Sequence, residues 1–160
     1  MVGDSAGGAL ALGLAITTEL PAPAAVVGLS PWTDMTLSGR SMKTNRPTDA
    51  LFGGEHPMDL DGMVDFVLGG AGGDRLDPRV SPLHGDLTRL PPSYLQASGS
   101  EMLLDDARRV ADAAPDAVLL HVFDDQQHTF QMAAGRSPVA DDAIARIAAW
   151  LRDHLQVAER

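Results

Sequence analysis

The chain opens with Met1-Val2-Gly3-Asp4-Ser5-Ala6-Gly7-Gly8, and this stretch decides how the rest of the sequence is interpreted. It contains the pattern G-x-S-x-G, in which a serine occupies a strained turn between a strand and a helix. Gly3 and Gly7 flank the serine because a side chain at either position is expected to clash where strand and helix approach each other. The pattern predicts that Ser5 presents its hydroxyl as a nucleophile.

The residues that follow the motif support this interpretation. A bare G-x-S-x-G arises by chance in about one chain in twenty of this length, so a glycine-rich turn with an incidental serine is the alternative. Residues 6–20, AGGALALGLAITTEL, form an apolar run that ends before the turn signal Pro21-Ala22-Pro23. Such a run is typical of a helix that starts beneath the serine and packs on a sheet.

The composition is that of a globular chain with one domain, residues 1–160. These 160 residues, 44% of them hydrophobic, can bury a single core, but they contain no run of about 18 apolar residues that could span a bilayer. No signal peptide precedes the motif, and the chain has no cysteine, so we expect a cytoplasmic protein without a metal or other cofactor. The net charge of −10 disfavours nucleic acid and anionic membranes as partners.

Beyond the first helix, strands and helices alternate. The predicted strands cover residues 24–29, 93–97 and 117–123, and the further predicted helices cover residues 58–68, 103–114 and 141–155. Residues 30–57 lack sustained periodicity and are predicted to form a surface excursion that contacts substrate. The order predicts an α/β fold in which a parallel sheet of about three strands is flanked by helices.

Two later residues are candidates for a catalytic triad with Ser5. A serine hydroxyl is a weak nucleophile until a histidine takes its proton and a carboxylate holds that histidine in the right tautomer. Glu101 follows the second predicted strand and His128 follows the third, in the order that this turn requires. Asp105 and Asp106 are alternative acids, although their place in the first turn of a helix also suits a partner for the helix dipole. The remaining histidines are interpreted as structural or surface residues without the spacing of zinc ligands: His56, His84, His121 and His154.

Five segments together resemble the hormone-sensitive-lipase family of bacterial esterases, and the resemblance covers nearly the whole chain. It implies an α/β-hydrolase fold and hydrolysis of carboxylic esters through an acyl-enzyme, on short acyl chains or small alcohol and aryl esters. The five segments are Gly3-Asp4-Ser5-Ala6-Gly7-Gly8, Ser30-Pro31-Trp32-Thr33-Asp34, Asp77-Pro78-Arg79-Val80-Ser81-Pro82-Leu83, Gly99-Ser100-Glu101-Met102-Leu103-Leu104-Asp105-Asp106-Ala107 and Gln127-His128-Thr129-Phe130.

The acid turn departs from the family pattern. Many members carry Asp-Pro-Leu there, and this chain has Glu101-Met102-Leu103. A glutamate can serve because its carboxylate needs only to reach one imidazole nitrogen. The same triad would also support acyl transfer or amide hydrolysis.

The resemblance also bears on the oxyanion site. The backbone N–H of Ala6 is expected to be one donor, whereas the family takes the second from a His-Gly-Gly-type loop well before the serine. We therefore expect a partial fold that lacks the N-terminal strands, including the strand entering Ser5, and the lid. Two hypotheses follow: a carboxylesterase that acts on a small ester, and a catalytically inactive truncated fragment or oligomer-forming module that makes a homo-oligomer through an exposed sheet edge.

Overall fold

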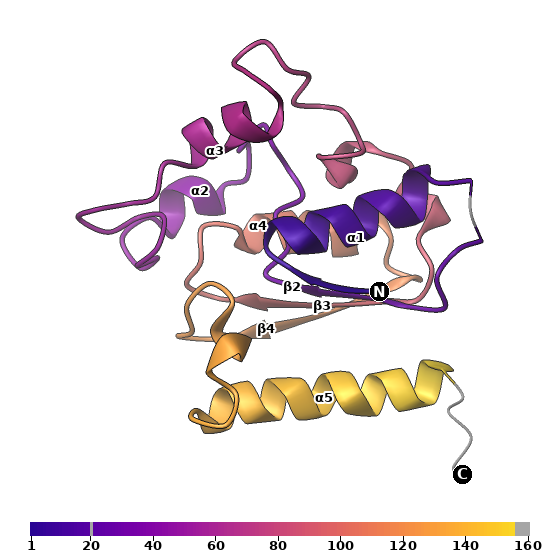
Figure 1. The fold of residues 1–160 in the computed structure, drawn as a ribbon. Coiled ribbons are helices and arrows are strands. Elements are labelled where there is room, and N and C mark those ends of the chain that lie inside the picture. Colours follow the sequence, from indigo (N-terminus) through magenta and orange to yellow (C-terminus); the bar gives the residue numbers. More distant parts are fainter. Residues whose placement is uncertain (20, 156–160) are drawn as a thin grey trace.

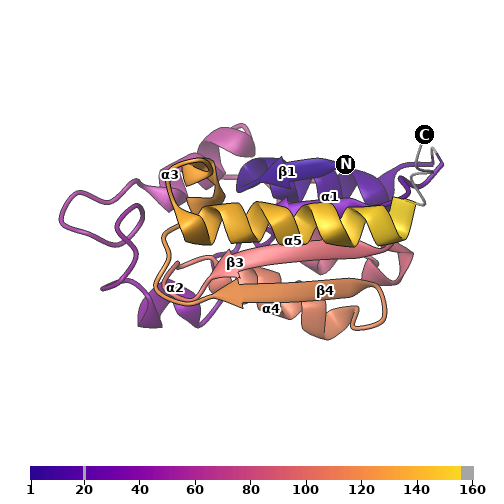
Figure 2. The same ribbon diagram turned by 90° about the horizontal axis from the view of Figure 1, so that it is seen from below.

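The computed structural model describes residues 1–19 and 21–155 and shows a parallel sheet between two layers of helices (Figures 1 and 2). Neighbouring strands are all parallel and lie in the order β1-β2-β3-β4. The predicted α/β class is confirmed, with four strands where about three were expected: β1 (Val2–Asp4), β2 (Val26–Leu29), β3 (Ser93–Ser98) and β4 (Val118–Phe123).

The additional strand is the one that leads into Ser5. The expectation that this strand would be absent is wrong, because Val2–Asp4 pairs in parallel with Val27–Leu29. Three residues at the start of a chain are too few to show the alternation by which a strand is recognised in sequence. Their pairing with the apolar β2 makes them a strand.

Helices cover both faces of the sheet. In Figure 1, α1 (Ala6–Thr17) and α4 (Leu104–Ala113) lie on one face and α5 (Pro138–Leu155) lies on the other. Two shorter helices, α2 (Ser41–Thr44) and α3 (Leu60–Val67), belong to the long connection between β2 and β3. The predicted helices agree with these bounds to within a few residues, except that the predicted end of the first helix, Leu20, lies outside the described residues.

The strand side chains divide between two cores. Val26 and Leu95 belong to the core beneath α1 and α4, whereas Val27 and Tyr94 belong to the core beneath α5. Successive residues of a strand point to opposite faces, so a sheet covered on both sides needs apolar residues at adjacent positions. This requirement explains why residues 24–29 read as a continuous apolar run.

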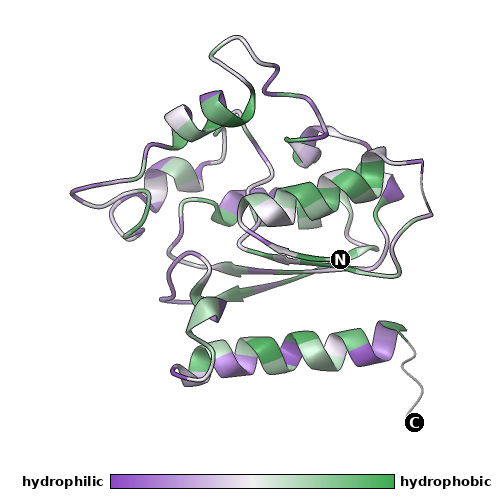
Figure 3. Ribbon diagram, in the orientation of Figure 1, coloured by the Kyte–Doolittle hydropathy of each residue, from purple (hydrophilic) through white to green (hydrophobic). Residues whose placement is uncertain are grey.

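Helix α1 is apolar around its whole circumference (Figure 3). Its inner side packs on the sheet, and its outer side leaves Leu10 and Leu14 exposed at 54% and 53%. Large apolar side chains that gather on a surface often mark a contact. Among the described residues, none of the helices has both the length and the apolar content needed to cross a bilayer.

Part of the expected surface excursion forms a third buried cluster. Residues 30–57 contribute Trp32, Met35, Met42 and Phe52 to a buried cluster that also contains residues of α3 and the Met102-Leu103 turn. The prediction of a surface excursion was wrong for these side chains. Irregular backbone buries residues without the periodicity that marks a helix or strand.

We expect Gly3→Ala to destabilise the fold by at least about 2 kcal/mol, because it forces an overpacked contact. A Cβ atom at Gly3 would lie 2.1 Å from the Gly7 carbonyl oxygen, which belongs to backbone and cannot turn away. The matched control is Gly72→Ala, whose Cβ would meet nothing within 4 Å and should change stability by less than about 0.5 kcal/mol. Urea unfolding measures both variants, and equal effects would contradict the steric explanation.

Candidate active site

The turn at Ser5 is strained and firmly held. Ser5 has φ 48° and ψ −119°, a conformation that costs a residue with a side chain on the order of 1–3 kcal/mol. Its N–H donates to the Leu29 carbonyl at 2.9 Å, and its carbonyl accepts from the Trp32 N–H at 3.0 Å. The end of β2 and the loop after it therefore hold the serine in this conformation.

The two glycines of the motif have different roles. Gly3 is required by its close approach to the backbone of Gly7, as expected. A Cβ atom at Gly7 would meet only the Asp4 carboxylate, at an ordinary 3.8 Å, so the expected clash at this position is absent. The crowded neighbour is Gly8, where a Cβ atom would lie 2.8 Å from the Pro31 Cβ.

The structure brings Ser5, Glu101 and His128 together. The His128 Nε2 atom lies 2.9 Å from the Ser5 Oγ, and its Nδ1 atom lies 2.6 Å from the Glu101 Oε2. The second carboxylate oxygen of Glu101 accepts from the Ser98 N–H at 2.9 Å. Because the Glu101 side chain is fully buried, it contacts the imidazole without competition from water.

Ala6 is the first residue of α1. The first N–H groups of a helix have no acceptor within the helix and lie at the positive end of its dipole. The Ala6 N–H therefore lies directly after the serine, at the N-terminal end of α1.

The two alternative acids bind other parts of the chain. Asp105 accepts from the Ser41 N–H at 2.9 Å, at the start of α2. Asp106 accepts from the N–H groups of Thr33 and Asp34, at 2.7 and 2.9 Å. Both carboxylates connect α4 to the connection after β2, whereas Glu101 contacts the imidazole.

Asp34 is the buried centre of a polar cluster whose other members are partly exposed. His84 lies 3.0 Å from its Oδ1, and Arg109 donates to its Oδ2 at 2.7 Å. Burial opposes ionisation, but hydrogen bonds from Ser38, Thr36, His84 and Arg109 outweigh it and hold the pKa of Asp34 well below its usual range. The cluster joins α4, the loop after β2 and the 3-10 turn Pro82–His84.

Asp106 has the opposite electrostatic character. Burial raises the pKa of its carboxyl well above the usual range, and the N–H donors of Asp34 and Thr33 only partly offset this effect. Its Oδ1 atom is buried and has no hydrogen-bond partner among the described residues. A protonated carboxyl fits this environment, because a charge there would be poorly solvated.

The other histidines do not contact Ser5 or Glu101 among the described contacts. His84 binds Asp34, His121 stacks on Phe123 with ring centroids 4.7 Å apart, and His154 contacts the Trp150 carbonyl on α5. His56 is exposed. Within residues 1–19 and 21–155, no three His, Asp or Glu side chains gather as a metal site would require.

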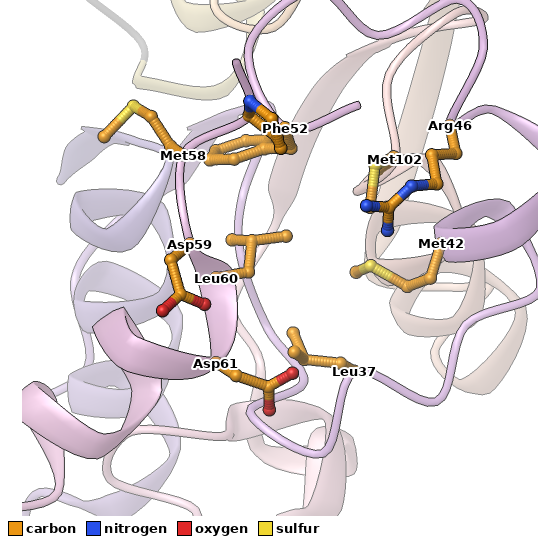
Figure 4. A pocket seen from close by; sticks show the side chains of 10 residues that line it. Leu37, Met42, Arg46, Phe52, Met58, Asp59, Leu60, Asp61 and Met102 are labelled. Carbon is orange, nitrogen blue, oxygen red and sulfur yellow. The ribbon is translucent and has the colours of Figure 1, made fainter. Parts of the chain in front are cut away.

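Two hollows are lined by neighbours of Ser5, Glu101 and His128, although none of these three residues lines either hollow. A groove of about 300 Å³ is lined by Asp4 and Thr129, which adjoin Ser5 and His128, and by apolar residues that include Val2 and Met132. A cavity of about 490 Å³ lies on the other side of Phe52, whose ring edge contacts the His128 ring. Figure 4 shows this cavity with Arg46 on one wall and two α3-side carboxylates opposite, Asp59 and Asp61.

Comparison with known proteins identifies the family. Residues 1–132 match the family model described as alpha/beta hydrolase fold. An acetyl-hydrolase of Streptomyces hygroscopicus is 36% identical over 158 residues, covering 95% of this chain and 51% of the relative. An esterase of Acinetobacter venetianus is 35% identical, covering 91% and 49%. The chain belongs to the α/β-hydrolase fold family, and it spans about half the length of the curated relatives it matches.

Solved structures agree with this assignment. An esterase from the bacterial hormone-sensitive lipase family superposes with a TM-score of 0.82 at 39% identity, over 96% of this chain and 52% of the other. The resemblance stated from the sequence is therefore confirmed at the level of family and fold.

Residues that support the site were missed in the sequence. Asp34 and Asp49 are buried, and Phe52 packs on His128, yet all three come from the stretch interpreted as a surface excursion. The available signal was the mixture of Trp32 and Phe52 with isolated aspartates, because large aromatic residues are seldom fully exposed. No local pattern indicates which backbone groups these aspartates bind.

We expect Asp106→Asn to become more stable relative to the wild type as pH rises. Above about pH 4 the unfolded chain loses the Asp106 proton while the folded chain keeps it, so this carboxyl lowers wild-type stability by about 1.4 kcal/mol per pH unit until its raised pKa is reached. Asparagine cannot ionise and removes that slope.

Urea unfolding at a series of pH values, with Asp112→Asn on the exposed side of the same helix as control, measures this difference. A stability difference between Asp106→Asn and wild type that stays constant with pH would contradict the assignment of a retained proton.

Proposed function

We propose that this chain carries the catalytic triad of a carboxylic-ester hydrolase, with Ser5 as nucleophile, His128 as base and Glu101 as acid. The observation that supports it most directly is the continuous line of contacts from the Ser5 Oγ through both imidazole nitrogens to a buried carboxylate. Esterases and an acetyl-hydrolase among the similar proteins support the same reaction class.

In the first half of the reaction Ser5 Oγ attacks the ester carbonyl carbon. The His128 Nε2 takes the hydroxyl proton, while Glu101 stabilises the positive charge that forms on the ring. Collapse of the tetrahedral intermediate breaks the ester C–O bond, and the imidazolium returns its proton to the departing alcohol. The products are a free alcohol and an acyl group on Ser5.

In the second half, water attacks the acyl carbonyl and His128 takes its proton. The intermediate releases the carboxylic acid and restores the Ser5 hydroxyl. The Ala6 N–H stabilises the oxyanion in both halves, and the loss of one such donor typically costs about 10²- to 10³-fold in rate. In the family that this chain resembles, a glycine-rich loop that precedes the serine supplies the second donor.

We propose short-chain or small esters as substrates. The groove of about 300 Å³ beside Asp4 and Thr129 is of modest size, and its lining is mainly apolar. A similar protein is named an acetyl-hydrolase, which also favours a short acyl group. We expect the rate on p-nitrophenyl esters to be higher for acetate and butyrate than for the long-chain palmitate.

We expect hydrolysis of p-nitrophenyl butyrate by the 160-residue chain to depend on Ser5. Ser5→Ala should lower kcat/KM by at least about 10³-fold, because the acyl-enzyme can no longer form. A fluorophosphonate probe should label the wild type and fail to label this variant, which detects an activated serine even where turnover is slow.

Two controls sharpen that test. Ser100→Ala should retain full activity, because the hydrogen bonds of Ser100 are made by its backbone groups. Glu101→Gln should lower kcat by about 10³- to 10⁴-fold, whereas Asp105→Asn should lower it by less than about 10-fold. Equal rates for wild type and Ser5→Ala would reject the proposed function. A loss of kcat that is larger in Asp105→Asn than in Glu101→Gln would show that Asp105 is the acid instead of Glu101.

We also propose that β1 mediates association between copies of this chain. It is an edge strand whose only described neighbour is β2, and its Val2 side chain is 65% exposed. An unpaired strand edge is a template for another strand, and a two-fold axis would pair β1 with β1 of a second copy. We expect light scattering to give a dimer that Val2→Lys converts to monomer, whereas a wild-type monomer would reject this association.

A further inference from the structure

Residues 45–53, which we call the bracing loop, form hydrogen bonds with the segments that carry Glu101 and His128. On one side lies the acid turn, residues 99–102, which carries Glu101. On the other lies the base loop, residues 127–128, which carries His128. The acid and the base follow different strands, so a segment that binds both turns restrains the separation between them.

The bracing loop holds the backbone of the acid turn. The Asn45 Nδ2 donates to the carbonyls of Gly99 and Glu101, both at 2.9 Å. The Thr48 hydroxyl donates to the Ser100 carbonyl at 3.0 Å. Three consecutive carbonyls of the turn therefore receive hydrogen bonds from this loop.

Asp49 is the buried centre of the bracing loop. Its Oδ2 accepts from the N–H of Met102, the residue after the acid, at 2.7 Å. Its Oδ1 accepts from the N–H groups of Leu51 and Phe52, both at 2.9 Å. The Phe52 ring meets the His128 ring edge-on, with centroids 5.0 Å apart and an angle of 65°. One carboxylate thus fixes the backbone beside the acid and the aromatic ring beside the base.

The base loop is also tied directly to the bracing loop. The Gln127 Oε1 accepts from the Ala50 N–H at 2.8 Å, and its Nε2 donates to the Thr48 carbonyl at 3.1 Å. Gln127 immediately precedes His128. Movement of the bracing loop would therefore displace both partners of the serine.

We propose that Asp49 is a positioning residue for the hydrolysis proposed above, holding Glu101 and His128 in mutual register through the Met102 N–H and the Phe52 ring. This role rests on the proposed function but involves no contact with a reacting atom. Catalytic groups have to be held within about 0.5 Å of their productive geometry. A displacement of about 1 Å can cost about 10²-fold in rate.

The test is Asp49→Asn, which keeps the side-chain size but replaces one acceptor oxygen with an NH2 group facing backbone N–H donors. We expect kcat on p-nitrophenyl butyrate to fall by about 10²-fold while KM changes by less than about 3-fold. In the double variant Asp49→Asn/Glu101→Gln, the combined loss should be smaller than the product of the two single losses, because Asp49 acts in part through Glu101.

The matched control is Asp86→Asn, since Asp86 also accepts a backbone N–H, that of Thr88, in a 3-10 turn without a bond to the acid turn or base loop. It should leave kcat unchanged. Losses that multiply in the double variant, or an unchanged kcat in a folded Asp49→Asn, would overturn the proposal. Should Asp49→Asn fail to fold by circular dichroism, Phe52→Leu provides the second variant: it removes the ring edge against His128, and an unchanged kcat there would overturn the proposal as well.

A readout without turnover separates this proposal from the proposed function. The His128 Nδ1–H proton bonded to Glu101 should give a downfield NMR resonance in the wild type that weakens or moves upfield in Asp49→Asn. A resonance that is identical in both proteins would overturn the positioning role of Asp49. Loss of Ser5-dependent turnover with a resonance that still responds to Asp49→Asn would reject the esterase function and leave the positioning role intact.

Discussion

The parallel direction of all four strands is the constraint on which the rest of the structure depends. Parallel strands end at the same edge of the sheet, so the segments after β1, β3 and β4 converge there. Ser5, Glu101 and His128 each follow one of these strands, although up to 123 positions separate them in the chain. Helices on both faces are the corollary, since each crossover between parallel strands has to pass over the sheet.

The strained backbone conformation of Ser5 is held in place by the parallel sheet. A side chain with φ 48° persists because the Ser5 N–H and carbonyl are both bound by residues that follow or end β2. The turn therefore belongs to the packed sheet and is not an isolated loop. Close approach of Gly3 to Gly7 and of Gly8 to Pro31 follows from the same packing.

Buried carboxyl groups connect distant segments around the site in a chain with a net charge of −10. Glu101, Asp49 and Asp106 all accept backbone N–H groups, and Asp34 adds the side chains of His84 and Arg109. Backbone N–H donors are fixed by the fold. A carboxyl group that accepts from them therefore links separate segments without needing a long, flexible Lys or Arg side chain as its partner. Four acidic residues thus belong to the interior of the protein: Asp34, Asp49, Glu101 and Asp106.

The sequence by itself determined the α/β class, the α/β-hydrolase family and the residues proposed for the triad, because these depend on local patterns: the G-x-S-x-G turn, apolar runs, and the order of serine, acid and histidine. Only the tertiary structure decided that Val2–Asp4 is a strand, that Trp32, Met35, Met42 and Phe52 of residues 30–57 are buried, and that Glu101 and not Asp105 or Asp106 contacts His128. The physical reason is that strand pairing, burial of irregular chain and the choice among neighbouring carboxylates depend on partners far away in the chain, from 25 positions for Val2 and Val27 to 123 for Ser5 and His128, and no local pattern records them.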